Sequence, residues 1–157
     1  MPGPYLHQIS ISDGGVPKLP VAEARLTVNG VAGDRQRNLE AHGGVDRAIC
    51  LFSLEVIEAL KAEGHSIRPG SSGENLTIAG LDWPKLLPGA RLRIGDTVLL
   101  EMMSYTSPCK YNAQWFANGD FSRISQKLHP GWSRLYARVL AEGVVRPGDR
   151  VTVEEHA

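Results

Sequence analysis

The residue best suited to chemistry is Cys109, in the segment Ser107-Pro108-Cys109-Lys110, which follows an apolar stretch ending near Met103. The proline is expected to bend the chain and to present the thiol, exposed, at the end of a strand. The adjacent Lys110 favours the thiolate, which is the nucleophilic form and the form that binds soft metals. The alternative interpretation is an inert cysteine, because free cysteine is usually buried and unreactive.

The second cysteine, Cys50, lies within the continuous apolar run 48–52, which is typical of a buried strand. We therefore expect Cys50 to belong to the core. The two cysteines have no CxxC spacing, so the sequence supports neither a disulfide framework nor a zinc site.

A cluster of glycines and charged residues could cradle an anion. It consists of Gly33-Asp34-Arg35, His42-Gly43-Gly44 and Asp46-Arg47. Glycines let backbone N–H groups approach a ligand, and arginine offers a planar fork to phosphate. The alternative is a polar surface loop with turn glycines, since the spacing matches no Walker or dinucleotide motif.

The segment 70–77 combines small residues with a carboxylate, an amide and a hydroxyl, which belong to Glu74, Asn75 and Thr77. Such groups could bind the donors and acceptors of a heterocycle. The alternative is a loop that enters a strand, in which Asn75 and Thr77 satisfy backbone groups.

Several short elements must position these residues. Ser53 is suited to cap a helix over 53–63 that Gly64 ends, and a second short helix is expected over 122–128. Trp115, Phe116, Trp132 and Tyr136 are read as core or lid residues without a chemical role. Apolar runs and turn residues predict strands over 5–12, 21–28, 47–52, 92–94, 98–102, 135–140 and 150–153.

The length of 157 residues, with 42% hydrophobic and 22% charged residues, is that of one ordinary domain. We expect a single domain over residues 1–157, mainly β, with one or two short α-helices and most plausibly a closed or nearly closed β-barrel. The 17 glycines and 10 prolines agree with many tight turns between short elements.

The charges balance, with 17 Lys and Arg against 17 Asp and Glu. This removes the electrostatic argument for a partner such as nucleic acid or an anionic membrane. No apolar run approaches the roughly 18 residues of a membrane span, and the N-terminus does not have the pattern of a signal peptide. A cytoplasmic location is expected.

Taken in order, six motifs resemble those of the MOSC domain family, named for the C-terminal domain of molybdenum cofactor sulfurases. The resemblance spans nearly the whole chain. Single motifs are weak, but the ordered set is specific. The motifs are Gly33-Asp34-Arg35, His42-Gly43-Gly44-Val45-Asp46-Arg47-Ala48, Gly73-Glu74-Asn75-Leu76-Thr77, Ile94-Gly95-Asp96, Pro108-Cys109 and Arg146-Pro147-Gly148-Asp149.

The resemblance implies a β-barrel with a pocket for the pyranopterin molybdenum cofactor (molybdopterin). The family's cysteine is matched by Cys109, which would bind molybdenum or carry a persulfide sulfur. Arg35 and Arg47 are the residues best suited to the cofactor phosphate. By the same resemblance, the pocket would be lined by Arg35, His42, Arg47, Glu74, Asn75 and Thr77.

The leading functional hypothesis is a molybdenum-dependent oxidoreductase that reduces a small N-hydroxylated substrate. Electrons would come from a separate reductase, because no flavin or ferredoxin-like motif is present. The alternatives are a sulfur carrier in which Cys109 accepts sulfur from a donor protein, and a non-catalytic cofactor-binding module. Many relatives have Pro-Arg shortly before the Pro-Cys pair, whereas Tyr105-Thr106 stands here, so one cation of the common pattern is absent.

Overall fold

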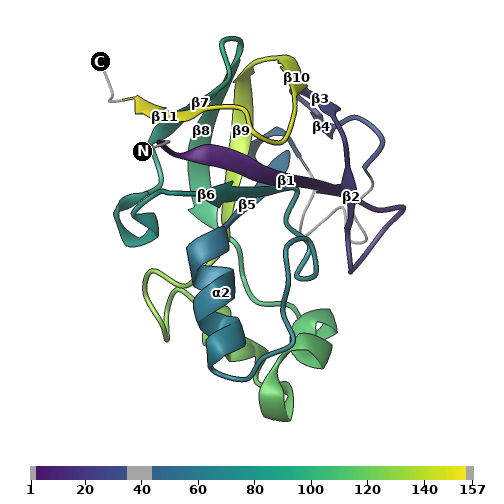
Figure 1. The fold of residues 1–157 in the computed structure, drawn as a ribbon, viewed down its shortest axis with the longest axis vertical. Helices are drawn as coiled ribbons and strands as arrows, with labels where there is room; N and C mark the ends of the chain where they lie inside the picture. Colours follow the sequence, from purple (N-terminus) through teal and green to yellow (C-terminus); the bar gives the residue numbers. More distant parts are fainter. Residues whose placement is uncertain (1–2, 35–43, 155–157) are drawn as a thin grey trace.

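The computed structural model describes residues 3–34 and 44–154, and its largest element is a curved eight-stranded sheet (Figure 1). The strand order in this sheet is β11-β7-β8-β9-β5-β6-β1-β2, and a second sheet has the order β10-β3-β4. The strands are β1 (Tyr5–Ile11), β2 (Leu19–Val21), β3 (Ala24–Thr27), β4 (Gly30–Val31), β5 (Ile49–Ser53), β6 (Leu76–Ala79), β7 (Arg91–Ile94), β8 (Val98–Tyr105), β9 (Leu135–Ala141), β10 (Gly143–Val145) and β11 (Val151–Glu154).

One α-helix, α2 (Leu54–Ala62), follows β5 directly, and the chain returns from it to β6, which pairs with β5 in parallel. Parallel neighbours need such a crossover connection. The other described pairs in both sheets are antiparallel. Short 3-10 helices complete the fold: η1 (Val45–Arg47), η2 (Trp83–Lys85), η3 (Lys110–Trp115), η4 (Ala117–Gly119) and η5 (Phe121–Ile124).

The mainly β prediction is confirmed, but the sheet is not a closed barrel. The two edges of the sheet approach each other where β1 meets the chain just before β11. Tyr5 and Arg150 form an isolated antiparallel bridge, and the Leu6 amide donates to the Asp149 carbonyl at 2.9 Å. Because no continuous ladder joins β1 to β11, the sheet keeps two ends and is a nearly closed barrel.

The helix prediction over 53–63 is confirmed. Ser53 caps α2, because its hydroxyl accepts the Val56 amide at 3.2 Å, and the buried side chains Val56, Ile57 and Leu60 face the sheet. The run 48–52 also forms the expected buried strand, β5, in which every residue is buried.

Two predicted elements were wrong in part. The strand expected over 21–28 is divided, since β2 pairs with β1 in the large sheet whereas β3 pairs with β10 in the small one. The helix expected over 122–128 is only the 3-10 turn η5, which ends because Ser125 adopts an extended backbone. Both differences reflect tertiary pairing that local propensity does not contain.

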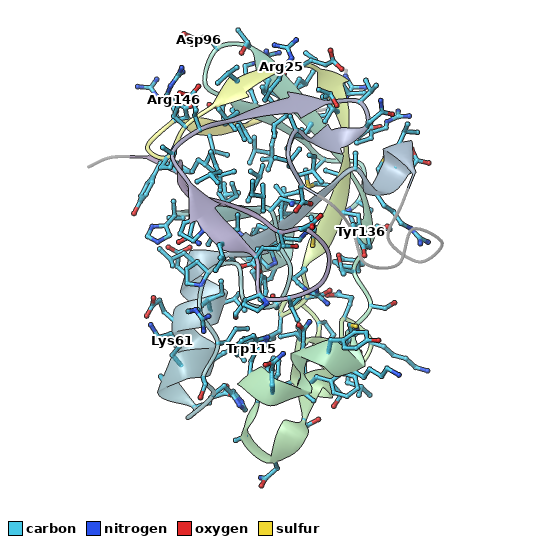
Figure 2. The ribbon with its side chains drawn as sticks, turned by 90° about the vertical axis from the view of Figure 1, so that its right-hand side faces the viewer. Arg25, Lys61, Asp96, Trp115, Tyr136 and Arg146 are labelled. Carbon is cyan, nitrogen blue, oxygen red and sulfur yellow. The ribbon has the colours of Figure 1, made fainter. Side chains whose placement is uncertain are left out.

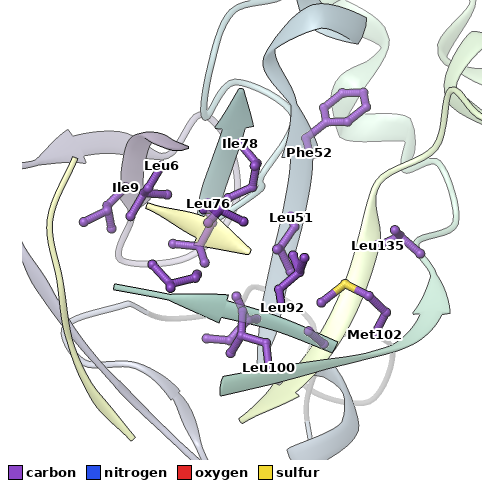
Figure 3. Close-up of a cluster of buried hydrophobic side chains, with 14 of the residues drawn as sticks. Leu6, Ile9, Leu51, Phe52, Leu76, Ile78, Leu92, Leu100, Met102 and Leu135 are labelled. Atoms are coloured by element: carbon purple, nitrogen blue, oxygen red, sulfur yellow. The ribbon is translucent and has the colours of Figure 1, made fainter. Parts of the chain in front are cut away.

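The apolar core lies between the curved strands and α2 (Figure 3). Leu6, Leu51, Leu76, Leu92 and Leu100 from five different strands are fully buried. At about 25 cal/mol per Å² of apolar surface, such burial is the main stabilising contribution. The core fixes the strands whose ends carry the polar residues described next.

Candidate functional site

Cys109 lies where β8 has ended and η3 begins, at the N-cap of η3. Its side chain is partly exposed and its sulfur is free. Hydrogen bonds hold the main chain around Cys109. The Ser107 carbonyl accepts a hydrogen bond from Arg134 Nη2 at 3.1 Å, and the Cys109 carbonyl accepts one from the backbone N–H of Asn112 at 2.8 Å. The expected thiol after a proline bend is therefore present, partly rather than fully exposed, on an anchored loop.

Tyr136 lies beside Cys50 in the sheet. The two residues pair across β5 and β9, and Tyr136 also pairs with Ser104 of β8. Figure 2 places Tyr136 midway along the molecule, between the strands and the 3-10 segment. Burial, followed by the charges of Cys50 and Cys109, raises the pKa of Tyr136, whereas Arg134 and Arg47 oppose the rise. Tyr136 therefore keeps its phenolic proton, and these four side chains are its electrostatic neighbours.

Cys50 is a core residue, as the sequence predicts, but one side of it is polar. Its Sγ lies 3.6 Å from Oγ1 of Thr106, the residue that follows β8. Burial raises the pKa of the Cys50 thiol, against the charge of Arg134 and the Thr106 hydrogen bond. The neutral thiol is therefore favoured, and Cys50 is suited to packing rather than to nucleophilic chemistry.

Glu74 is a fully buried carboxyl group just before β6. Its oxygens accept the Gly70 amide at 3.0 Å, the Ser72 hydroxyl at 2.9 Å and the Thr77 hydroxyl at 3.4 Å. Burial raises the Glu74 pKa despite these hydrogen bonds and the charge of Arg134. Gly70 has a φ of +84°, and a Cβ there would lie 2.5 Å from the Lys18 carbonyl, so this turn requires glycine.

Asn75 ties three segments together. Its Oδ1 accepts the Cys50 amide at 3.0 Å, and its Nδ2 donates to the Ser10 carbonyl at 3.3 Å and to Asp34 Oδ2 at 2.9 Å. Asp34 also forms a buried ion pair with Lys18, with Nζ 2.7 Å from Oδ1. The side chains of Asn75 and Glu74 are thus engaged within the protein, which is the arrangement of a polar loop that enters a strand.

Arg134, immediately before β9, was not identified from the sequence. Only 3% of the residue is exposed. Its Nη1 donates to the Ser72 carbonyl at 2.7 Å, and Asn112 Nδ2 donates to the same carbonyl at 3.0 Å. Arg134 Nε and Asn112 Oδ1 are buried without a hydrogen-bond partner within the described residues. The carbonyl of Ser72 therefore joins the Glu74 loop to the Cys109 loop.

Arg47 ends η1 and is exposed. Its guanidinium carbon lies 5.8 Å from the centre of the Tyr136 ring, which is within cation–π range. Lys110, by comparison, has its Nζ 5.6 Å from the ring centre of Tyr111. Arg47 is thus an accessible cation near the Cys109 loop.

The structure brings most of the predicted site residues to one end of the sheet. Cys109 and Arg47 are accessible there, whereas Glu74, Asn75 and Thr77 are buried behind them. Arg35 and His42 lie outside the described residues. The residues that sequence reasoning missed are Lys18, Asn112 and Arg134, since their importance comes from neighbours in other segments. Asp34 was named in the anion-binding cluster without its pairing to Lys18, and Tyr136 was read only as a core or lid residue.

The described residues contain no group of three or more His, Cys, Asp and Glu side chains that could hold a metal ion. Separately, none of the helices within 3–34 and 44–154 has the length and apolar character of a membrane span.

A β fold of this topology with a cysteine on the loop after β8 fits a known class of protein domain. The family model described as "MOSC domain" matches residues 38–152. The chain belongs to the MOSC domain family.

Relatives support this assignment. The uncharacterized protein YflK of Bacillus subtilis (strain 168) is 33% identical over 138 residues, which is 85% of this chain and 60% of YflK. A protein named "Reductase" from Gibberella moniliformis (strain M3125 / FGSC 7600) is 28% identical over 134 residues, or 82% of this chain and 23% of that protein. The chain thus spans less than two thirds of either relative.

Among solved structures, YiiM from Geobacillus stearothermophilus has a TM-score of 0.74 and 22% identity to this chain. The match covers 97% of this chain and 75% of YiiM. At this identity the likeness supports the fold.

Proposed function

We propose that this protein binds the molybdenum cofactor through Cys109 and reduces small N-hydroxylated substrates with electrons from a separate reductase. The observation that carries the proposal is a free, partly exposed thiol on an anchored loop, with cationic side chains around it. Membership of the MOSC domain family and the relative named "Reductase" support it.

The residues present fit such a cofactor. A thiolate is a soft ligand suited to molybdenum, and cationic side chains suit an anionic, phosphate-bearing group. Arg134 Nε is a buried donor without a partner in the described part of the chain, and Glu74 favours its neutral form. The local balance at this end of the sheet therefore favours an anion.

Each residue would have a definite task. Cys109 would hold the metal, and Arg47, the accessible cation, would bind the phosphate together with Arg35. Glu74, Asn75 and Thr77, which the family resemblance assigns to the pocket, would act through their hydrogen bonds by fixing the pocket wall. His42 keeps the pocket role that the resemblance implies.

When bound, the cofactor would supply two-electron redox chemistry at molybdenum. Reduction of an N–OH group consumes two electrons and two protons, breaks the N–O bond, and yields an N–H group and water. The electrons would come from a separate reductase protein. The chain's own contribution is to hold the metal at Cys109 and to exclude water from the buried polar groups behind it.

The deciding experiment measures molybdenum and pterin per chain in protein purified from a host that makes the cofactor. Wild type is expected to carry about one molybdenum per chain, and Cys109→Ser is expected to lose it. Cys50→Ser is the matched control and should retain molybdenum. A Cys109→Ser protein with full molybdenum content and full reductase activity would overturn the proposal.

The second candidate is a sulfur carrier, which the same accessible thiol favours. In this case the Cys109 thiolate would attack the outer sulfur of a persulfide on a donor protein. The S–S bond of the donor breaks, the donor leaves as its thiolate, and Cys109 carries the persulfide. Intact-mass measurement should then show a reducible adduct of about one sulfur atom that is absent from Cys109→Ser, in protein without molybdenum. The non-catalytic cofactor-binding module remains the outcome in which molybdenum is bound and no N-hydroxylated compound is reduced.

A further inference from the structure

Arg134 is a buried cation that forms no ion pair with a described residue. Its guanidinium bonds to two neutral carbonyls, those of Ser72 and Ser107, and Nε has no partner in the described residues. Lys18 is also buried, but Asp34 pairs with it directly. An isolated charge in a protein interior is costly, and buried charges are therefore normally paired or serve a function.

No carboxylate of the described residues lies within ion-pair distance of Arg134, whose guanidinium bonds carbonyl oxygens instead. The Glu74 carboxyl group acts on Arg134 at longer range, and burial raises its pKa. A guanidinium stays charged at every physiological pH. Arg134 is therefore a buried positive charge with no described carboxylate in direct contact.

The charge is directed toward the Cys109 loop. Arg134 binds the carbonyl of Ser107, two residues before Cys109, and the charges of Arg134 and Cys109 both act on Tyr136. Thr106, which starts this loop, donates its amide to the Arg134 carbonyl at 2.9 Å. A negative charge on the Cys109 sulfur, or on a group bound to it, would lie on the loop that the guanidinium holds.

We propose that Arg134 is the positioning residue of Cys109, which fixes the Ser107–Cys109 loop and supplies the buried positive charge that stabilises negative charge at the Cys109 sulfur. The inference rests on the proposed function in that it takes Cys109 as the reactive group. The family pattern has Pro-Arg where this chain has Tyr105-Thr106, so one cation of that pattern is absent here. Arg134, which immediately precedes β9, would supply a cation to the same loop in its place.

The test compares two alkylating reagents of similar size and different charge on the protein without cofactor. Iodoacetate is an anion and iodoacetamide is neutral, and peptide-level mass spectrometry follows the reaction of Cys109 with each at one fixed pH and low salt. The ratio of the two rate constants reports the electrostatic potential at the sulfur. A change in loop position alone alters both rate constants together and leaves the ratio unchanged.

Arg134→Gln is expected to lower the iodoacetate-to-iodoacetamide ratio by about three- to tenfold, the order of a unit charge acting through a partly screened interior. Arg134→Lys keeps the charge and should restore the ratio to within about twofold of wild type. Arg138→Gln is the matched control, since Arg138 lies on β9, the strand that Arg134 precedes, and pairs with Glu101. Its ratio should equal that of wild type.

An unchanged ratio in folded Arg134→Gln, whatever happens to the separate rates, would overturn the proposal. If Arg134→Gln does not fold, the double variant Arg47→Gln/Lys110→Gln provides the measurement. Both side chains are exposed, and their removal leaves Arg134 as the main cation near Cys109 among the described residues. The ratio at Cys109 should then be higher in the folded protein than in the same protein unfolded in urea. An equal or lower folded ratio would overturn the proposal.

This test is independent of the proposed function. If the ratio depends on Arg134 but the protein does not bind molybdenum, the role of Arg134 as the positive charge near Cys109 is supported. The function is then better explained by sulfur transfer. If the protein binds molybdenum and the alkylation ratio is the same in wild type and Arg134→Gln, the proposed function stands and Arg134 does not have this role.

Discussion

The two ends of the large sheet differ sharply in what they bury. Around β7, β11 and the start of β8, the buried side chains are apolar, for example Leu92, Leu100 and Val151. Around the end of β8 and the starts of β6 and β9, the buried residues include Glu74, Asn75, Thr77, Thr106, Asn112 and Arg134. One strand, β8, spans both regions, because it runs from Val98 toward Thr106.

The difference separates the region that stabilises the fold from the region in which we propose that a ligand binds. Apolar burial is favourable without further conditions, whereas each buried polar group must be matched by a partner. Among the described residues, the buried side-chain atoms without a hydrogen-bond partner are Arg91 Nε on β7, Asn112 Oδ1, Trp115 Nε1, Arg123 Nη1 and Arg134 Nε. Of these, Asn112 Oδ1 and Arg134 Nε belong to the buried polar residues of the polar end, and both residues bond to the Cys109 loop. Such local conflicts with stability are typical of functional sites.

The largest effect is expected at the apolar end. Leu100→Ala should lower the free energy of unfolding by about 2–5 kcal/mol, because it leaves a cavity in the core. Urea unfolding followed by circular dichroism measures this change. Leu140→Ala, at a residue that is 39% exposed on the neighbouring strand, should cost far less. If the folded fraction of Leu100→Ala loses its molybdenum, the apolar end also contributes to binding, and the contrast between the two ends is wrong.

Asn75→Ala should cost about 2–3 kcal/mol at the polar end. The change removes the acceptor of the Cys50 amide and the donor to Asp34, which leaves buried groups without partners. The same urea measurement applies, with the exposed Asn29→Ala as control. A cost for Asn75→Ala as small as that of Asn29→Ala would show that the buried hydrogen bonds contribute nothing to stability.

Glu74 predicts a pH dependence. Its folded pKa is raised above the ordinary value of 4.5, so the folded state binds this proton more tightly than the unfolded chain does. The contribution to the free energy of unfolding is fully present below pH 4.5 and is lost as the pH rises toward the folded pKa, by at most about 1.4 kcal/mol per pH unit. Glu74→Gln should remove this slope.

The measurement is urea unfolding of both proteins at a series of pH values above 4.5. Glu58→Gln, at an exposed residue of α2, should retain the wild-type slope. Parallel stability curves for wild type and Glu74→Gln would contradict a raised pKa.

The smallest effect separates the two cysteines. Cys50→Ser should cost about 1 kcal/mol, since a hydroxyl would be buried with only Thr106 as a partner, whereas Cys109→Ser should cost little. Thermal unfolding of the two variants under identical conditions measures the difference. Equal melting temperatures would place both thiols in equivalent surroundings and remove the contrast.

Much of the strand and helix pattern could be predicted from sequence, since its signals are local. The continuous run around Cys50 indicated β5, the turn at Gly95-Asp96 separated β7 from β8, and Ser53 marked the start of α2. These features depend on hydrophobic patterning and turn chemistry within a few residues. They were sufficient for the mainly β fold but not for the open edge between β1 and β11.

The polar end could be predicted only in part. Cys109 was identified from its own proline and its position after a strand. Arg134 was not, because an arginine at the start of a strand is ordinarily exposed, and its burial results from the loops that carry Ser72 and Ser107. The ion pair of Lys18 with Asp34 likewise joins residues from separate segments. Such neighbours follow from strand order, which no short motif specifies.

Asn75 links the Ser10 and Cys50 segments directly, while Arg134 and Thr106 come from the far half of the chain. Contacts of such high sequence separation form late and slow folding, because loop closure must come before they are made. A folding intermediate with only local structure would therefore have no assembled site. A cofactor could consequently bind at Cys109 only after folding is complete. Truncation of either half of the chain should abolish cofactor binding altogether rather than weaken it.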